Sequence, residues 1–225
     1  MTPETEYDFV DYLKGGLNIA LFIGIDFTAS NGLPHNPASL HYINSNKTMM
    51  NPYQLVIKEC GDILLDYDDD KLVPVYGFGA DLGYPRMKTN GVSHSFPCTG
   101  IKGTEEVYHI QGIFDVYEYA HKHISFNGPT FFAPLFKDII DLTRVRSFEN
   151  PDNYNFFMII TDGEIHDMVD TVECLVNACE LPLSVVIIGV GDETFENMKR
   201  LDSGDCCDKL GRVPSRDICR FVRFK

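Results

Sequence analysis

The chain has 225 residues, of which 44% are hydrophobic and 23% charged, and its formal net charge is −14. These values are typical of one globular domain with a well-buried core and exclude a disordered chain. The acidic balance argues against nucleic acid as a partner and against unaided adhesion to anionic lipid, because both need clustered Lys and Arg. No apolar run approaches the roughly 18 residues of a membrane-spanning helix, and no signal peptide follows Met1. We therefore expect a soluble, cytoplasmic protein.

Strands and helices alternate along the chain. Residues 1–16 are predicted to be a lead-in linker with a short helix over 7–12, and residues 17–225 to form the domain. Apolar runs bounded by turn signals predict strands over residues 17–24, 72–80, 156–161, 184–189 and 219–224. Apolar residues at helical spacing predict helices over residues 52–66, 105–123, 134–142, 171–180 and 195–201. This alternation predicts an α/β fold, with a doubly wound, mostly parallel sheet and helices on both faces.

The cysteines give no sign of a disulfide framework. Their number is odd, they form no C-x-x-C pair, and their spacing has no order: Cys60, Cys98, Cys174, Cys179, Cys206, Cys207 and Cys219. This favours free thiols in a reducing compartment. A zinc site is not expected either, because no histidine pair falls at ligand spacing.

A carboxylate and two hydroxyls follow the first predicted strand at alternate positions. They belong to Asp26, Thr28 and Ser30. All three offer hard oxygen atoms, which are the ligands that Mg²⁺ and Mn²⁺ prefer. Ligands of open α/β sheets bind at the carboxyl ends of the strands. The sequence therefore predicts half of a divalent-metal site here.

Two later residues complete this site in the prediction. Thr130 lies in a loop after the helix predicted over 105–123, and Asp162 ends the strand predicted over 156–161. If the first strand and this strand are parallel neighbours, Asp26 and Asp162 meet at the same edge of the sheet. Five oxygen side chains with two charges would leave coordination positions open for water or for a guest ligand.

The pattern D-x-[ST]-x-S … T … D resembles the metal-ion-dependent adhesion site of von Willebrand factor A domains. Further stretches outside this motif resemble the copine branch of these domains. They cover nearly the whole chain and occur in the family's order. The resembling stretches are residues 9–16, 25–32, 40–43, 76–80, 128–130, 133–134, 161–163, 181–191, 216–218 and 220–222.

The resemblance implies a von Willebrand factor A fold of Rossmann-like type and a role for each oxygen residue. Thr28 and Ser30 would contact the cation directly. Asp26, Thr130 and Asp162 would bind it directly or through water. The implied ion is Mg²⁺ or Mn²⁺, with Ca²⁺ as a further option. The implied partner is an intracellular protein whose Asp or Glu completes the coordination.

Copines bind phospholipid in a calcium-dependent manner through two C2 domains that precede the A domain, and this chain contains no C2 domain. The resemblance thus implies the non-enzymatic protein-interaction domain of a copine-like, calcium-dependent phospholipid-binding protein. The full-length protein would be cytoplasmic and would move to membranes when calcium rises.

Two other functions remain open at this level. A haloacid-dehalogenase-like phosphotransferase would use Asp26 as nucleophile beside Mg²⁺, with Asp162 and Asp167 as its acidic pair. Ser30 and Thr130 would have no role in that chemistry. The other function comes from plant relatives in which a copine-type domain carries a RING finger, so that the domain would bind the substrates of a ubiquitin ligase.

Three further residues lie near the predicted site in sequence. His166 and Glu164 follow Asp162 closely enough to approach the metal, although both are also typical of an exposed loop. The pair Phe131 and Phe132 follows Thr130, and it could form an apolar rim for a partner or be buried in the core.

Overall fold

The computed structural model describes residues 14–44, 46, 48–204 and 206–225. Within these residues the chain forms a central seven-stranded sheet in the order β10-β9-β8-β1-β2-β5, and β6 also pairs with β2. The strands of this sheet are β1 (Asn18–Asp26), β2 (Leu72–Phe78), β5 (Phe96–Pro97), β6 (Glu106–Tyr108), β8 (Asn153–Thr161), β9 (Leu183–Gly189) and β10 (Cys219–Arg223). The short helix predicted over 7–12 lies outside the described residues.

The sheet is parallel through its centre. The pairs β1–β2, β1–β8, β8–β9 and β9–β10 are all parallel, whereas β5 and β6 pair antiparallel with β2. β1 is fully buried from Ile19 to Asp26, and its side chains alternate between the two faces because successive residues of a strand point in opposite directions. Phe22 packs in one hydrophobic core, and Leu21 and Ile23 pack in the other. Such two-sided burial explains the continuous apolar run of β1.

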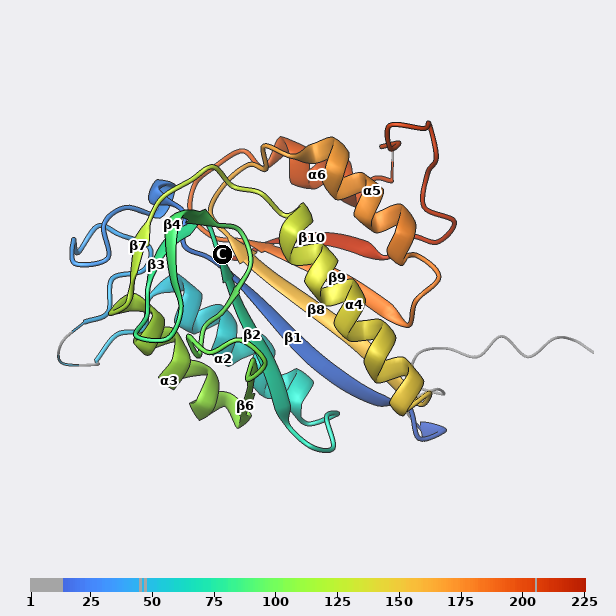
Figure 1. The fold of residues 1–225 in the computed structure, drawn as a ribbon, viewed down its shortest axis with the longest axis horizontal. Helices are drawn as coiled ribbons and strands as arrows, with labels where there is room; N and C mark the ends of the chain where they lie inside the picture. The colour runs from blue at the N-terminus through green and yellow to red at the C-terminus, as the bar shows by residue number, and fades with distance from the viewer. Residues whose placement is uncertain (1–13, 45, 47, 205) are drawn as a thin grey trace, which may run out of the picture.

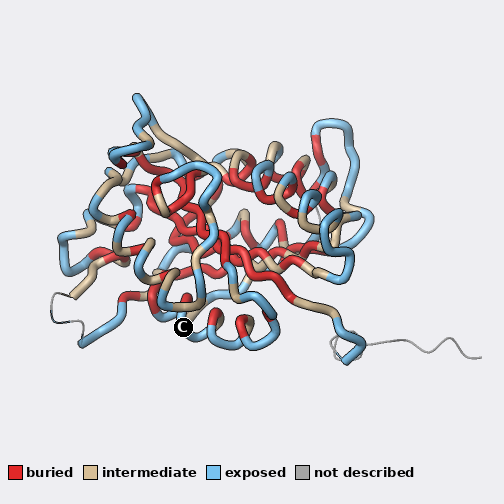
Figure 2. Tube along the Cα trace, turned by 60° about the horizontal axis from the view of Figure 1, so that its bottom comes forward, coloured by how far each residue is buried: buried red, intermediate tan, exposed pale blue. Residues whose placement is uncertain are grey.

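Helices cover both faces of this sheet. α2 (Pro52–Leu65) and α3 (His109–His121) pack on one face, and α4 (Ala133–Glu149), α5 (Met168–Ala178) and α6 (Glu196–Asp202) pack on the other. Figure 1 shows these two layers on opposite sides of the central strands, and Figure 2 shows the buried residues concentrated between them. The prediction of a doubly wound α/β fold is confirmed.

A second, smaller sheet lies outside the predicted plan. Its three strands run in the order β4-β3-β7 and are antiparallel: β3 (Ala80–Gly83), β4 (Lys88–Ser93) and β7 (Ile124–Phe126). β4 is largely exposed and carries few apolar residues, so it gives little strand signal in the sequence. The strand predicted over 72–80 is divided: β2 ends at Phe78 and β3 begins at Ala80. Gly79, with a positive φ of 79°, turns the chain between them.

One predicted helix begins later than expected. The helical pattern of 105–123 places its start at Glu105, but Glu106–Tyr108 form β6, which pairs with the first half of β2. His109, the first residue of α3, has a positive φ of 59° and separates the strand from the helix. Pairing with a strand that is distant in sequence thus overrides the local helical pattern.

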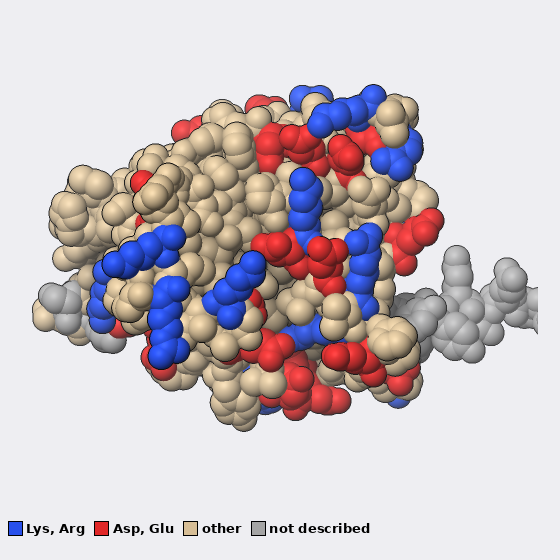
Figure 3. Space-filling view, viewed as in Figure 1, with Lys and Arg blue, Asp and Glu red and all other residues tan. Residues whose placement is uncertain are grey.

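The helices and the cysteines agree with what the composition predicts. In the part of the chain that the structure describes, no helix is both long and apolar enough to cross a bilayer. All seven cysteines are free thiols, and most are buried. On the face in Figure 3, acidic and basic side chains are interspersed over much of the surface. The exposed ion pairs of the described residues include Lys209–Asp170 and Arg144–Asp141.

Candidate metal site

The carboxyl ends of β1 and β8 lie side by side at one edge of the central sheet. The two strands are parallel, and Ile25 pairs with Ile160 one residue before Asp26 and Thr161. Asp162 follows directly, so the two aspartates come from adjacent strands and lie at the same edge. The sequence-based expectation that they meet at one sheet edge is therefore confirmed.

Asp26 is completely buried, and both of its carboxylate oxygens are hydrogen-bonded. Oδ1 accepts from the backbone N–H of Thr28 at 2.8 Å and from the Thr28 hydroxyl at 2.6 Å. Oδ2 accepts from the Thr161 hydroxyl at 2.5 Å. Burial raises the pKa of Asp26, and the hydrogen bonds from Thr161 and Thr28 oppose that rise. These donors stabilise a negative charge in the interior of the protein.

Asp162 is held from the other side of the same loop. Its Oδ1 accepts from the Ser30 hydroxyl at 2.8 Å and from the Asn31 amide at 3.0 Å. The hydroxyl oxygens of Thr28 and Ser30 are 2.9 Å apart, so the side chains from Asp26 to Asp162 form one row of close polar contacts. When both hydroxyls donate to the carboxylates, no proton lies between the two hydroxyl oxygens. Burial raises the pKa of Asp162, and the nearby charge of Asp26 raises it further.

Thr130 lines the same surface cavity as Thr28 and Ser30. The cavity has a volume of about 480 Å³ and is lined by Thr28, Ala29, Ser30, Asn127, Gly128, Pro129, Thr130, Gly163, Glu164, His166 and Glu193. Thr130 is 4% exposed, and its backbone carbonyl accepts from the N–H of His166 at 2.9 Å. The structure thus places Thr28, Ser30 and Thr130 in the wall of one cavity, with Asp26 and Asp162 hydrogen-bonded to two of them.

The loop that carries Thr28 is fixed by a close backbone approach. Thr28 forms an isolated parallel bridge with Asn127, and Asn127 donates its N–H to the carbonyl of Gly79 at 2.9 Å. A Cβ atom at Gly79 would lie 2.3 Å from Thr28 Cγ2. Only glycine therefore fits at this position, both for its positive φ and for its contact with Thr28.

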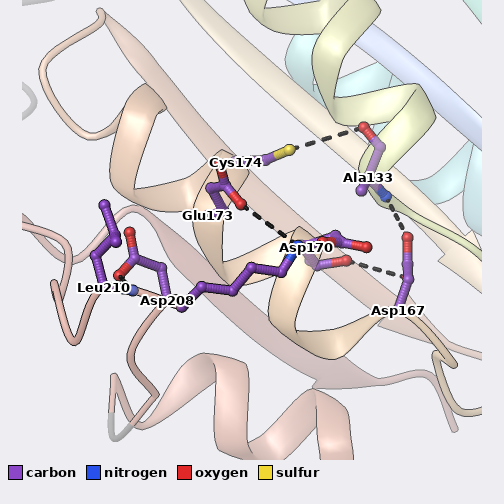
Figure 4. Close-up of polar contacts among 9 residues, drawn as sticks. Ala133, Asp167, Asp170, Glu173, Cys174, Asp208 and Leu210 are labelled. Carbon is purple, nitrogen blue, oxygen red and sulfur yellow. Dashed lines mark hydrogen bonds and ion pairs between the residues drawn. The ribbon is translucent and has the colours of Figure 1, made fainter.

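Asp167 joins the Thr130 loop to the Asp162 loop. Its Oδ1 accepts from the N–H of Phe132 at 3.0 Å, and its Oδ2 accepts from the N–H of Ala133 at 2.8 Å. Figure 4 shows Asp167 beside Ala133 at the start of α4. An acidic side chain on the free N–H groups of a helix start is a favourable arrangement. Together with the Thr130–His166 hydrogen bond, this contact sets the position of Thr130.

The nearby residues that the sequence left open have distinct places. Glu164 and His166 both line the cavity, and Glu164 Oε2 accepts from the N–H of Asn197 at the start of α6. Phe132 is fully buried, which settles its role as a core residue rather than as a rim. Phe131 is half-buried and packs on His94.

The donor set fits a hard divalent cation. The Thr28 and Ser30 hydroxyls can each donate their one proton to a carboxylate and keep an oxygen lone pair for a cation. Two carboxylates and three hydroxyls suit Mg²⁺ or Mn²⁺ better than a soft metal. Among the described residues there is no group of three or more His, Cys, Asp or Glu placed to hold a metal, so a cation here would depend on the hydroxyls. Binding itself remains a prediction.

Several residues of the site escaped the sequence-based analysis. Asn31 directly follows Ser30, and Thr161 directly precedes Asp162. Asn31 and Thr161 are thus next to predicted ligands but do not occupy a ligand position of the pattern. From the sequence, Asp167 suggests only an enzymatic pair with Asp162. The contact of Gly79 with Thr28 depends on the packing of three separate loops and has no local signal in the sequence.

Comparison with known proteins identifies relatives along the whole chain. A family model described as Copine matches residues 39–225. The chain is 40% identical to Protein BONZAI 2 and 39% identical to Protein BONZAI 1, both of Arabidopsis thaliana, over 100% of this chain and 38% of each relative. It is 37% identical to Nicotinic receptor-associated protein 1 of Caenorhabditis briggsae, over 98% of this chain and 34% of that protein. The chain thus spans little more than a third of the length of these curated relatives.

A solved structure supports the assignment of the fold. Manganese-loaded TRAP protein of Plasmodium vivax superposes with a TM-score of 0.50 at 12% identity, covering 92% of this chain and 69% of that chain. At this identity the likeness concerns the fold alone. It agrees with the von Willebrand factor A type that the resemblance implies.

Proposed function

The chain belongs to the copine family, and from this premise we propose that it is a protein-interaction domain that recruits partners through a divalent cation. The observation that carries this proposal is the row of close polar contacts that joins Asp26 to Asp162 through the Thr28 and Ser30 hydroxyls. This arrangement is costly without a cation, because two buried carboxylates lie close enough behind the cavity wall for the charge of Asp26 to raise the pKa of Asp162. The proposed ligands are Asp26, Thr28, Ser30, Thr130 and Asp162.

The proposed ion is Mg²⁺ or Mn²⁺, with Ca²⁺ as a further option. When bound, the ion would supply a positive centre for an acidic side chain of an intracellular partner protein. The carboxylates of Asp26 and Asp162 are buried, and hydroxyl side chains line the open cavity where the ion would bind. With two carboxylates and three neutral donors, a divalent ion retains room for another anionic ligand. Manganese in the TRAP structure makes Mn²⁺ a suitable probe.

A titration with Mn²⁺ tests the metal part of the proposal. The melting temperature of the domain should rise with Mn²⁺, because an ion that binds only the folded state stabilises it by mass action. Ser30→Ala and Asp26→Ala should abolish the rise. Thr104→Ala is the matched control, since its hydroxyl donates to the Ile101 carbonyl outside the cavity. An equal response in all four proteins would contradict the assignment.

A pull-down experiment tests the partner part of the proposal. Recovery of partners should need a divalent cation, and it should fall with EDTA, with an excess of a free acidic peptide and in Thr130→Ala. Thr130 contributes a loop hydroxyl rather than core packing, so this variant should remain folded. The same recovery under all conditions would show that recognition uses another surface.

Membrane association is proposed for the longer protein rather than for this domain. The net charge of −14 opposes binding to anionic lipid, so calcium-dependent phospholipid binding and membrane recruitment from the cytoplasm would come from C2 domains. Sedimentation with phosphatidylserine vesicles at physiological salt should recover little of this domain with or without calcium. Strong calcium-dependent sedimentation would place a lipid site within the domain itself. The alternative of a ubiquitin ligase depends on a RING finger in the longer protein, and its sequence would decide that question.

The contacts of Asp26 and Asp167 favour interaction over catalysis. Asp26 is fully buried and does not line the cavity, whereas a nucleophile must reach its substrate directly. Asp167 uses both oxygens on the start of α4 and is not free to pair with Asp162. We therefore expect no hydrolysis of p-nitrophenyl phosphate with Mg²⁺ present. Turnover that Asp26→Asn abolishes would revive the phosphotransferase.

A further inference from the structure

A buried tyrosine hydroxyl lies behind the candidate metal site. Tyr53 is in the first turn of α2, and none of its surface is exposed. A phenylalanine would fill the same space without burying a polar group, which costs free energy unless the group is hydrogen-bonded. The partner of this hydroxyl therefore indicates what it does.

The hydroxyl of Tyr53 leads to Asp162 through one residue. It donates to Asn31 Oδ1 at 2.7 Å, and Asn31 Nδ2 donates to Asp162 Oδ1 at 3.0 Å and to the Thr28 carbonyl at 3.2 Å. The Thr28 carbonyl can only accept, so it fixes which end of the amide carries nitrogen. The remaining end, Oδ1, then needs a donor, and Tyr53 is that donor.

The ring of Tyr53 is fixed as well. It stacks on the ring of His41 with a centroid distance of 3.8 Å and an interplanar angle of 18°. His41 Nε2 is 2.7 Å from the carbonyl of Asp26, which can only accept, so Nε2 carries the proton. His41 Nδ1 then accepts from the hydroxyl of Tyr117 on α3 at 2.7 Å. Tyr53 therefore stacks on His41, which is hydrogen-bonded to the backbone of Asp26.

We propose that Tyr53 is a positioning residue for the metal site, where it acts through Asn31 to orient the carboxylate of Asp162. The amide and the Ser30 hydroxyl both hold Oδ1, which leaves Oδ2 for a cation. Groups that orient a metal ligand in this way are typically worth 10- to 100-fold in metal affinity. This inference rests on the proposed function, since it assumes that Asp162 serves a cation.

The test compares two tyrosines in direct Mn²⁺ binding, followed by electron paramagnetic resonance of the free ion. Tyr53→Phe should bind Mn²⁺ about 10-fold more weakly than wild type. The control is Tyr84→Phe, because Tyr84 is also fully buried and its hydroxyl donates to the Cys98 carbonyl at 3.3 Å, away from the cavity. Both variants should lose a similar amount of stability in urea, but only Tyr53→Phe should lose affinity.

A double substitution separates positioning from general loosening. Asn31→Ala should weaken Mn²⁺ binding by itself, and adding Tyr53→Phe should then cost little more, because the intermediate residue is already gone. Additive losses, equal losses in Tyr84→Phe, or unchanged affinity in Tyr53→Phe would each overturn the inference. Failure of the wild type to bind Mn²⁺ would overturn the proposed function instead, so the two failures are distinguishable.

Discussion

The two faces of the central sheet differ in what they bury. The face under α4, α5 and α6 is filled mainly by apolar side chains, with Phe22, Phe136 and Phe157 at its centre. The face under α2 and α3 has an equally buried core, but it also encloses the hydrogen-bonded side chains of His41 and Tyr53.

The two faces differ because the buried polar groups of the α2–α3 face are hydrogen-bonded to the loops of the candidate metal site. The polar groups on the α2–α3 face reach the ends of the metal loops, through the Asp26 carbonyl on one path and Asn31 on the other. A buried polar group that is satisfied only by such partners ties the core to the site. We infer that substitutions in the apolar core under α4, α5 and α6, away from the carboxyl ends of β1 and β8, affect stability alone, whereas those on the polar face also affect the cation.

The largest expected effect is on the apolar face. Phe157 is fully buried, its ring meets Phe136 edge-on at 5.7 Å, and it lies over Gly24, which has no side chain there. Phe157→Ala should reduce the free energy of unfolding by about 3–5 kcal/mol, measured in urea, because a cavity remains in the core. Mn²⁺ affinity of the folded protein should stay within about twofold. A larger change in affinity would break the comparison between the faces.

His41→Leu on the polar face should cost less stability but more affinity. The change leaves the Asp26 carbonyl and the Tyr117 hydroxyl without this partner, at about 2–3 kcal/mol for buried polar groups. Because Asp26 is also disturbed, Mn²⁺ binding should weaken by about 10-fold. Calorimetric titration measures the affinity. A stable, fully folded variant with unchanged affinity would show that the polar network serves folding only.

The polar face should also respond to pH. Burial lowers the pKa of His121 to about 4 from its usual 6.5. As the pH falls, the unfolded chain therefore takes up a proton at a higher pH than the folded protein does. The free energy of unfolding is thus unaffected by His121 above pH 6.5 and decreases as the pH falls from 6.5 toward 4. Between about pH 7.5 and pH 5 this amounts to about 2 kcal/mol.

His121→Phe isolates this contribution. The replacement keeps an aromatic ring against Phe27 and Phe126 and removes an Nε2 atom that is buried without a hydrogen bond. Urea unfolding at both pH values should show a smaller loss in the variant by about 2 kcal/mol. The raised pKa values of Asp26 and Asp162 act in the opposite direction but are common to both proteins. Parallel pH profiles would contradict the prediction.

The smallest expected effect is a gain on the apolar face. Thr143 in α4 is fully buried, and its hydroxyl oxygen has no hydrogen-bond partner. Thr143→Val keeps the shape and removes this unsatisfied group, so the free energy of unfolding should rise by about 1 kcal/mol. Ser147→Ala is a useful contrast, since the Ser147 hydroxyl donates to the Thr143 carbonyl. Loss of stability in Thr143→Val would mean that the apolar face also depends on polar contacts.

Much of the main sheet could be predicted from the sequence, because its central strands are buried on both faces and read as apolar runs. β1 and β8 were predicted close to their observed places, and with them the meeting of Asp26 and Asp162. The small second sheet and β6 could not be predicted. The exposed β4 lacks a strand pattern, and β6 is a strand only because β2 lies beside it.

By itself, the sequence determined which oxygen side chains end which strands. Strand direction and parallel pairing then bring Asp26, Thr28, Ser30 and Asp162 to one edge of the sheet. Only the tertiary structure decided which residues orient them. Tyr53 and Asn31 lie 22 residues apart, and Asn31 and Asp162 lie 131 apart. A hydrogen bond needs its donor and acceptor at about 3 Å, and such a distance is set by the packing of helix on sheet rather than by any local pattern.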